Sequence, residues 1–311
     1  MLTDRPEAAF FDVLTPDDVP AIYTLVESLG WTHVVKDLEI MLQVSVFLGV
    51  RDSCGGIIAT GAIFPYGDDL ASIGMIMVNP GHQRRGYGRA VMEALHSHEA
   101  AQGRVLCLIA TEEGEPLYRK CGYEVAGRIR KFFGSPEQFL SRDSEPVLPN
   151  VTLRAMYKND LENIIRLDAK ALGASRHGLL EQRYLQADYA IVVEDKQGEI
   201  IGFTLASPQR EQHHLGPMIA PDSETALAMI RYVAERSEKE LRIDVPEKQV
   251  ELHSRLPDLG FTLIANPPAM IRSPEVVHPT TITLKSYSSL GASIYPGCRE
   301  LYWSIMSQAY A

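Results

Sequence analysis

Cysteine is scarce in this sequence, and long apolar runs are absent. The four cysteines lie far apart and form no Cys-x-x-Cys pair, which disfavours a zinc site or a disulfide framework and favours a reducing compartment. They are Cys54, Cys107, Cys121 and Cys298. No apolar run approaches the roughly 20 residues needed to cross a bilayer, and residues 1–7 do not resemble a secretory signal. The sequence therefore predicts a cytoplasmic protein without a membrane partner.

Positive charge is also in short supply. Across 311 residues, 30 Lys and Arg stand against 40 Asp and Glu, so the net charge is −10. Nucleic-acid binding depends on neutralising phosphates, so this balance disfavours a nucleic-acid partner. The same acidity mildly favours a cationic substrate such as an amine. The length is enough for two domains, and the 45% of hydrophobic residues is ordinary for a globular protein.

One stretch concentrates arginine and glycine between a predicted strand and a predicted helix. Residues 72–78 form an apolar run typical of a buried strand, and 87–98 carry apolar residues at the spacing of one helix face. Gly86 and Gly88 allow the backbone to come close to a ligand, and the first turn of a helix suits a phosphate. The alternative is a solvated surface turn, because glycine-rich turns before helices are common.

The combined pattern resembles the acyl-CoA-binding motif of the GNAT (GCN5-related N-acetyltransferase) superfamily. The motif matches Gln83-Arg84-Arg85-Gly86-Tyr87-Gly88, and Val78-Asn79-Pro80 is similar to its usual lead-in. A second stretch, Leu117-Tyr118-Arg119-Lys120-Cys121-Gly122-Tyr123, resembles another signature of that superfamily. The resemblance implies an acetyl-CoA-dependent N-acetyltransferase, with acetyl-CoA as the acyl-donor substrate and no metal.

The order of predicted elements occurs twice along the chain. Residues 8–133 predict strand, two helices, three strands, helix, strand, short helix and a final hairpin at 123–133, and 151–271 repeat this order closely. We therefore expect an α/β (α+β) fold of two tandem GNAT-like domains. Each would have a mixed, mostly antiparallel sheet flanked by helices, with a splayed central strand in the first domain. The predicted ranges are 1–134, a linker at 135–150, 151–272, and a tail at 273–311 with a strand at 280–286 and a helix at 297–310.

The resemblance assigns roles to individual residues. Tyr118 would be the general acid that protonates the leaving thiolate, and the backbone of Met77 and Val78 would pair with the pantetheine arm. The pyrophosphate would lie against the turn formed by Gln83, Arg84, Arg85, Gly86, Tyr87, Gly88 and Arg89. The general base stays open, with Glu27 and Glu112 as plausible carboxylates. The histidine pairs 96/98 and 213/214 are not spaced as metal ligands, and we predict them at the surface.

The second half lacks the chemistry of the first. Residues 216–226 contain no Gln/Arg-x-x-Gly-x-Gly, and Asp222 and Glu224 stand where a pyrophosphate would lie. We therefore predict a degenerate, non-catalytic second domain.

The predicted function is acetyl transfer to a primary amine of a small molecule by direct attack in a ternary complex. An acyl-CoA-binding regulatory module and a protein or peptide N-acetyltransferase are the alternatives; the acceptor, the acyl chain and the oligomeric state, including a homodimer, stay open.

Overall fold

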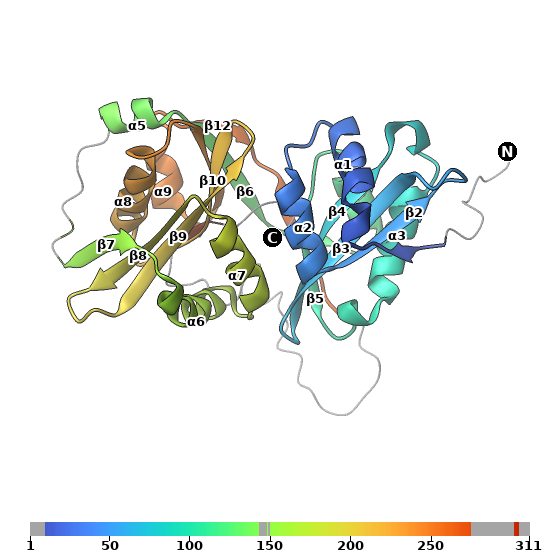
Figure 1. Cartoon of the computed structure of the whole chain (residues 1–311), viewed down its shortest axis with the longest axis horizontal. Coiled ribbons are helices and arrows are strands. Elements are labelled where there is room, and N and C mark those ends of the chain that lie inside the picture. The colour runs from blue at the N-terminus through green and yellow to red at the C-terminus, as the bar shows by residue number, and fades with distance from the viewer. Residues whose placement is uncertain (1–9, 143–147, 149, 275–301, 305–311) are drawn as a thin grey trace. The chain divides into compact units, whose positions relative to one another are not determined.

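The computed structural model describes residues 10–142, 148, 150–274 and 302–304 (Figure 1). The chain divides into two units. Of the described residues, unit 1 contains 10–124 and 270–274, and unit 2 contains 302–304 and those between 125 and 269. Each unit is therefore built from two stretches of chain that are far apart in the sequence.

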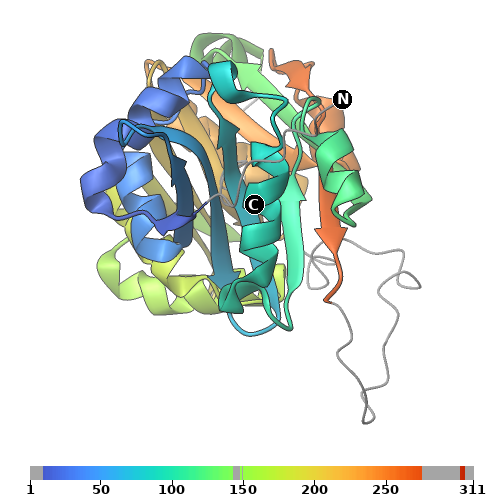
Figure 2. The ribbon, with the colours of Figure 1, turned by 90° about the vertical axis from the view of Figure 1, so that its right-hand side faces the viewer.

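The strands of unit 1 follow the order β1-β2-β3-β4-β5-β13. Neighbours are antiparallel from β1 to β4, whereas β4 and β5 are parallel. The strands are β1 Asp12–Val13, β2 Val46–Arg51, β3 Ile57–Tyr66, β4 Leu70–Val78, β5 Val105–Ile109 and β13 Pro268–Arg272. The helices are α1 Val19–Ser28, α2 Val35–Val44, α3 Tyr87–Ser97 and α4 Glu115–Lys120. α3 packs Val91, Met92 and Leu95 on one face of the sheet, and α1 and α2 lie on the other face (Figure 2).

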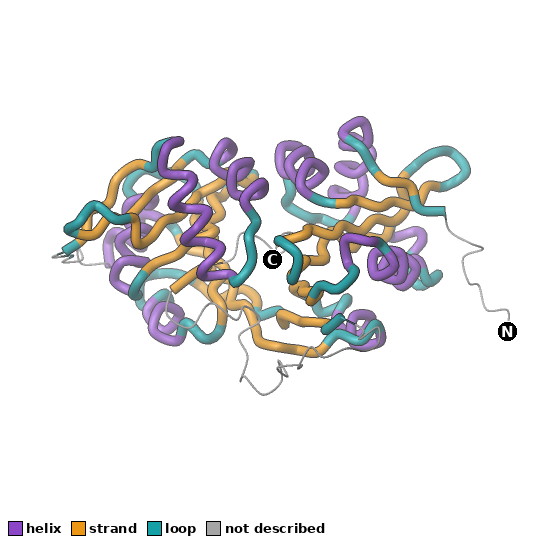
Figure 3. Tube along the Cα trace, turned by 90° about the horizontal axis from the view of Figure 1, so that it is seen from below, coloured by secondary structure: helices purple, strands orange, loops and turns teal. Residues whose placement is uncertain are grey.

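The strands of unit 2 follow the order β6-β11-β10-β9-β8-β7, with β12 beside β6 and β14 beside β10. They are β6 Glu124–Gly134, β7 Val151–Ala155, β8 Tyr189–Asp195, β9 Ile200–Gln209, β10 Gln212–Ala220, β11 Glu240–Pro246, β12 Thr262–Ala265 and β14 Tyr302–Ser304. The helices are α5 Pro136–Arg142, α6 Leu161–Leu172, α7 His177–Gln186, α8 Ser223–Ala234 and α9 Val250–Arg255. α8 packs Leu227 and Ile230 against Leu215 and Ile243 of the sheet. In both units helices cover both faces of the strands (Figure 3).

The predicted fold class is confirmed, because both sheets are mixed, mostly antiparallel and flanked by helices. Within the described part of the chain, no helix is long and apolar enough to span a membrane.

The last strand of the first half differs from the prediction. The hairpin predicted at 123–133 is wrong, because β6 is one continuous strand whose partners within unit 2 are β11 and β12. The predicted linker 135–150 begins with helix α5. Local alternation shows that a segment is extended, but its partner depends on contacts more than 100 residues away.

The last strand of the second half also differs. The single strand predicted at 261–271 is two strands: β12 pairs with β6 in unit 2, and β13 lies next to β5 in unit 1. Met270 on β13 is fully buried in the apolar cluster of unit 1. The last strand of each half therefore belongs mainly to the other unit. The domain ranges 1–134 and 151–272 stay a prediction.

The C-terminal segment is extended where we predicted a helix. Residues 302–304, inside the helix predicted at 297–310, form β14 and pair antiparallel with β10. The helix is therefore wrong at these three residues. The rest of that prediction, and the strand predicted at 280–286, lie outside the described residues.

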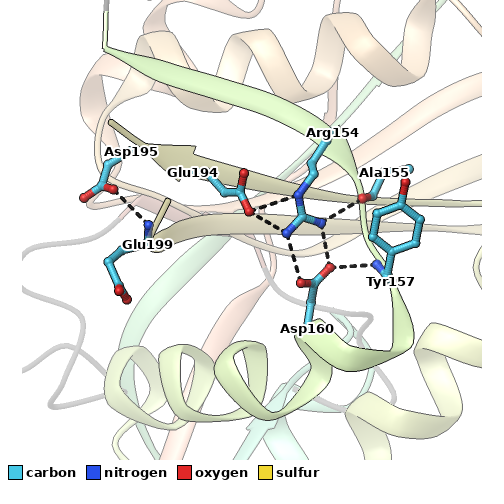
Figure 4. Close-up of polar contacts among 7 residues, drawn as sticks. All are labelled: Arg154, Ala155, Tyr157, Asp160, Glu194, Asp195 and Glu199. Carbon is cyan, nitrogen blue, oxygen red and sulfur yellow. Dashed lines mark hydrogen bonds and ion pairs between the residues drawn. The ribbon is translucent and has the colours of Figure 1, made fainter. Parts of the chain in front are cut away.

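An arginine of the edge strand β7, Arg154, links the start of helix α6 to the sheet (Figure 4). Arg154 of β7 donates hydrogen bonds to both carboxylate oxygens of Asp160, at 2.7 and 3.0 Å, and to Glu194 of β8 at 3.0 Å. Asp160 also accepts the N–H of Tyr157 at 2.7 Å. Such charge-assisted hydrogen bonds are stronger than neutral ones, so this group fixes where α6 begins.

Unit 1 contains a similar arrangement. Asp18, ahead of α1, accepts the N–H of Thr15 at 2.9 Å and a hydrogen bond from Arg51 of β2 at 2.6 Å. In both units the aspartate at the N-cap position of a helix is therefore held by an arginine from a strand. This likeness supports the internal repeat more specifically than the order of elements does.

Replacing Arg154 with alanine should destabilise unit 2. The loss should be about 1–3 kcal/mol in the free energy of unfolding, because two carboxylates lose charged hydrogen-bond donors. The hydrogen bond from Arg154 lowers the pKa of Asp160, so the contribution is present above the usual aspartate pKa and disappears as the pH falls through the lowered value. Denaturant unfolding at pH 7 and at about pH 3 tests this.

The control is Arg166→Ala, since the Arg166 side chain is 69% exposed and faces Glu162 at 3.8 Å. We expect little change for this exposed pair. Equal losses for the two variants, or a loss for Arg154→Ala that persists undiminished at low pH, would contradict the assigned role.

Candidate active site

The central strand of unit 1 loses one neighbour partway along. β4 pairs with β5 only from Leu70 to Ser72, whereas its pairing with β3 continues to Val78. Beyond Ser72, no strand in the described residues continues the ladder on the β5 side. An open backbone edge can accept an extended ligand through the hydrogen bonds that a strand would make. The predicted splay of this strand is confirmed.

A β-bulge lies at the divergence. From Gly74 to Met77 β4 advances three residues, while the facing part of β3 advances only two. Met75 has a left-handed φ of 53°, and its carbonyl oxygen accepts a hydrogen bond from Thr60 Oγ1 at 2.9 Å. A bulge bends its strand and increases the local twist. Thr60, which the sequence pattern did not reveal, therefore helps to hold the open edge in place.

The turn after β4 leads into an uncapped helix start. Gly86, the N-cap residue of α3, has a φ of 87°, which glycine adopts without strain. Gly86 has no side chain with which to cap α3, and the first N–H groups of a helix have no partner within the helix. Asn79 supports the turn by accepting the N–H of Gly81 at 2.9 Å. These N–H groups and the helix dipole together suit an anionic group.

The arginines of the turn are in two different states. Arg84 and Arg85 are exposed, and neither forms a hydrogen bond or ion pair with a residue that the structure describes. Arg89 donates to Glu93 Oε1 at 2.7 Å, and this hydrogen bond raises the pKa of Arg89. Positive charge available to a ligand therefore comes mainly from Arg84 and Arg85.

The end of β4, the start of α3 and helix α4 touch one another. A Cβ atom added at Gly88 would lie 3.2 Å from Leu117 Cδ2 and 3.8 Å from Val78 Cγ2. Val78 and Tyr87 pack against the apolar cluster that contains Tyr118. The structure therefore brings the sequence-predicted residues of the strand, the turn and the second signature together.

Tyr118 is buried and stays protonated. Its side chain is 8% exposed, and its ring lies edge-on to Tyr123 with the centroids 6.2 Å apart. Burial raises the pKa of Tyr118 well above its usual value, so the phenol keeps its proton across the neutral range. Gly114, one helical turn earlier, makes room for the ring, because a Cβ there would lie 2.8 Å from Tyr118 Cε2. The Gly-x-x-x-Tyr spacing is the sequence signal that could have identified Gly114.

Three titratable groups of unit 1 stand as candidates for the general base. Glu27 and Glu112, the two sequence candidates, are exposed. The structure adds His33, whose Nδ1 lies 3.8 Å from the buried carboxylate of Asp37. The i, i+4 spacing of His33 and Asp37 is the signal that could have found this pair. The general base therefore stays open.

The prediction that the second histidine pair lies at the surface is wrong. His213 is 4% exposed and bonds to Ser237 Oγ at 2.7 Å and Asp188 at 2.9 Å, while His214 is fully buried. Burial lowers the pKa of His214 to about 3, so this imidazole is neutral. The physical reason is that every residue of β10 is buried, so both faces of the strand are covered.

In the described part of the chain, no three His, Cys, Asp or Glu side chains gather as metal ligands would.

The corresponding turn of unit 2 has the opposite charge. Asp222 is the N-cap residue of α8, and its carboxylate accepts the N–H of Thr225 at 2.7 Å. Glu224, in the first turn, forms an ion pair with Arg255. A carboxylate at the positive end of a helix takes the place that a phosphate would need and repels it. The turn after β10 is therefore less suited to binding an anion than the turn after β4.

The fold and the site define a tandem α/β protein in which one unit combines an open central strand with an uncapped, arginine-flanked helix start. Two segments, 43–125 and 164–281, each match a family described as acetyltransferase (GNAT) domain. Because both halves match and tandem relatives share the fold, the chain belongs to the GNAT acetyltransferase superfamily as a tandem member, and it is an acetyltransferase.

Similar proteins agree with this assignment. The chain is 29% identical over 258 residues to the uncharacterized N-acetyltransferase YitH of Bacillus subtilis, covering 83% of this chain and 89% of that protein. A candidate acetyltransferase from Pyrococcus horikoshii has a TM-score of 0.73 at 18% identity, covering 98% of this chain and 96% of that one. A tandem GNAT protein from the clavulanic acid biosynthesis pathway has a TM-score of 0.63 at 14% identity, over 88% and 99% of the two chains. At such identities these two structures show a shared fold.

Substituting alanine for Gly114 should displace the Tyr118 ring. The added methyl carbon would lie 2.8 Å from Cε2, so the ring or the α4 backbone must shift. We expect a loss of about 1–3 kcal/mol of stability from this overpacking. Acetyl transfer should fall by a larger factor than the folded fraction does.

The matched control is Gly178→Ala in α7, where a Cβ would meet nothing within 4 Å and the backbone is not left-handed. This variant should be neutral or slightly stabilised, as expected for alanine within a helix. Full activity in Gly114→Ala would show that the ring position is not critical.

Proposed function

We propose that unit 1 transfers an acetyl group from acetyl-CoA to the primary amine of a small molecule. One observation carries this proposal: the open edge of β4 leads directly into an uncapped helix start, and Tyr118 packs in the same cluster as the end of that strand. An extended thioester ligand with an anionic end needs a strand-like edge followed by a phosphate-type turn. Unit 1 has the strand-like edge and then the phosphate-type turn, in that order along the chain.

The proposed binding of acetyl-CoA uses the backbone of Met77 and Val78 for the pantetheine arm. The pyrophosphate would lie against the N–H groups from Gln83 to Arg89, with Arg84 and Arg85 supplying charge. A fit is supported by the φ of Gly86 and by the close packing at Gly88, since a larger residue at either position would strain or fill the turn.

The proposed reaction is direct attack in a ternary complex. The neutral amine attacks the thioester carbonyl, a C–N bond forms, and the C–S bond breaks to release a thiolate. A base removes one proton from the attacking nitrogen, and Tyr118 donates its phenolic proton to the thiolate sulfur. Because burial raises its pKa, Tyr118 is protonated at neutral pH and so carries the proton that a general acid must supply.

Two alternatives use the same site differently. An acyl-CoA-binding regulatory module would bind the donor with little turnover, and a protein or peptide N-acetyltransferase would accept a larger amine. Retention of Tyr118 in a buried, protonated state favours turnover over binding alone. The net charge of −10 suits any cationic acceptor and does not separate a small amine from a lysine side chain.

Tyr118→Phe should bind acetyl-CoA normally and transfer acetyl slowly. Loss of a general acid typically costs about 10²–10⁴-fold in kcat. Free-thiol release across a panel of amines, amino acids and peptides measures turnover, and calorimetry measures binding. Tyr123→Phe is the matched control, since Tyr123 is buried in the same cluster. Undiminished turnover in Tyr118→Phe would remove this residue from its role, and binding without release on any acceptor would favour the regulatory module.

Replacing Arg84 and Arg85 together with alanine should weaken acetyl-CoA binding. Each charged hydrogen bond to a phosphate is worth about 1.5 kcal/mol or more, so we expect Kd to rise about tenfold or more. The effect should shrink at high salt, because both side chains are exposed. Arg166→Ala, which removes an exposed arginine of α6 in the other unit, is the control. An unchanged Kd in the double variant at low salt would place the phosphates elsewhere.

A further inference from the structure

The central strands of the two units carry the same bulge. In unit 1, Met77 faces Thr60 and Gly74 faces Ala62, so β4 advances three residues (77 − 74) while β3 advances two (62 − 60). In unit 2, Met218 faces Thr204 and Leu215 faces Ala206, which is three residues (218 − 215) against two (206 − 204). Aligning the bulges matches Met77 with Met218 and Val78 with Ile219.

The same alignment matches Thr60 of β3 with Thr204 of β9. Thr60 donates its hydroxyl proton to the bulge carbonyl of Met75. Thr204 occupies the equivalent place and is fully buried, but its hydroxyl has no hydrogen-bond partner among the described residues. The match in position strengthens the alignment of the two strands residue by residue.

Beyond the bulge, the two strands differ in what lies beside them. The parallel neighbour stops pairing at Ser72 in unit 1 and at Leu215 in unit 2. On β4, no described strand pairs with Met77 or Val78 on that side. On β10, Met218, Ile219 and Ala220 pair antiparallel with Ser304, Trp303 and Tyr302 of β14.

We infer that the edge of β10 at Met218, Ile219 and Ala220 is a strand slot that the chain's own C-terminal segment, 302–304, fills. The slot lies at the positions that correspond to the open edge of β4. In unit 1 this edge remains available to a ligand, and in unit 2 an antiparallel peptide strand takes its place. The second unit is therefore closed to an acyl donor at two points, the strand edge and the acid-capped helix start.

Burial supplies the physical reason for filling the slot. With β14 beside them, Met218, Ile219 and Ala220 are each at most 2% exposed, so their backbone N–H and C=O groups are removed from water. A buried backbone group without a partner is costly, and a paired strand removes that cost. The backbone of β14 also lies close to β11 and α8.

The slot fits one kind of partner, an extended peptide that runs antiparallel to β10. Backbone pairing of this kind supplies affinity without requiring a charged ligand. The inference does not depend on acetyl transfer, because it concerns the ladder of unit 2. Loss of catalysis in unit 1 and loss of strand pairing in unit 2 are measured separately.

The test removes the strand and then returns it. A chain ending at residue 301 should show hydrogen exchange at 218–220 about tenfold or more faster than the full chain, because each lost ladder bond weakens protection. A synthetic peptide of residues 299–311, added to the shortened chain, should restore the protection, whereas a scrambled peptide should not. Exchange at 75–78 in β4 should be the same in all samples.

A point variant keeps the chain length constant. Trp303→Pro removes a backbone N–H from β14 and should also speed exchange at 218–220, while Trp303→Val, a good strand former, should preserve protection. Unchanged exchange at 218–220 after deletion would overturn the inference. So would failure of the peptide to restore protection, or restoration by acetyl-CoA in its place.

Discussion

The interruption of one β-ladder is the constraint on which the structure of the site depends. A sheet normally satisfies the backbone of a central strand on both sides, but among the described residues β4 has a neighbour on only one side after Ser72. The bulge at Met75, whose carbonyl oxygen accepts a hydrogen bond from the hydroxyl of Thr60, lies just beyond the last residue of β4 that pairs with β5. The glycine turn and α3 continue from the end of β4. The position of each predicted site residue therefore follows from the point at which two parallel strands separate.

The second unit shows what this architecture becomes when the open edge is filled. Its central strand has the same bulge and the same divergence, but β14 completes the ladder and Asp222 caps the following helix. Both differences replace a potential ligand by a part of the chain: a peptide strand on the edge, and a carboxylate at the helix N-terminus. One fold thus supports an open site in one unit and a closed core in the other, without a change in the order of elements.

The sequence predicted the local features well, because they depend on neighbouring residues. Gly86 at the start of α3, the acid-rich start of α8 and the apolar face of α3 were all readable from spacing. The partner of a strand is a different matter. β6 alternates as a hairpin strand would, yet it pairs with β11 and β12, and residues with helical spacing at 301–305 include the strand β14. Periodicity records which faces of a segment are apolar, not which distant backbone will satisfy its hydrogen bonds.

By itself, the sequence determined the repeated order of elements and the single arginine- and glycine-rich turn. It also showed that this turn and the second signature, which contains Tyr118, occur in the same half of the chain. These are short-range patterns of size, charge and backbone freedom. Only the tertiary structure decided that the halves exchange their last strands, that His214 is buried and neutral, that Gly114 makes room for the Tyr118 ring, and that a C-terminal strand lies against β10. Each of these depends on which segments pack together across long stretches of chain, because burial and backbone pairing are properties of neighbours in space.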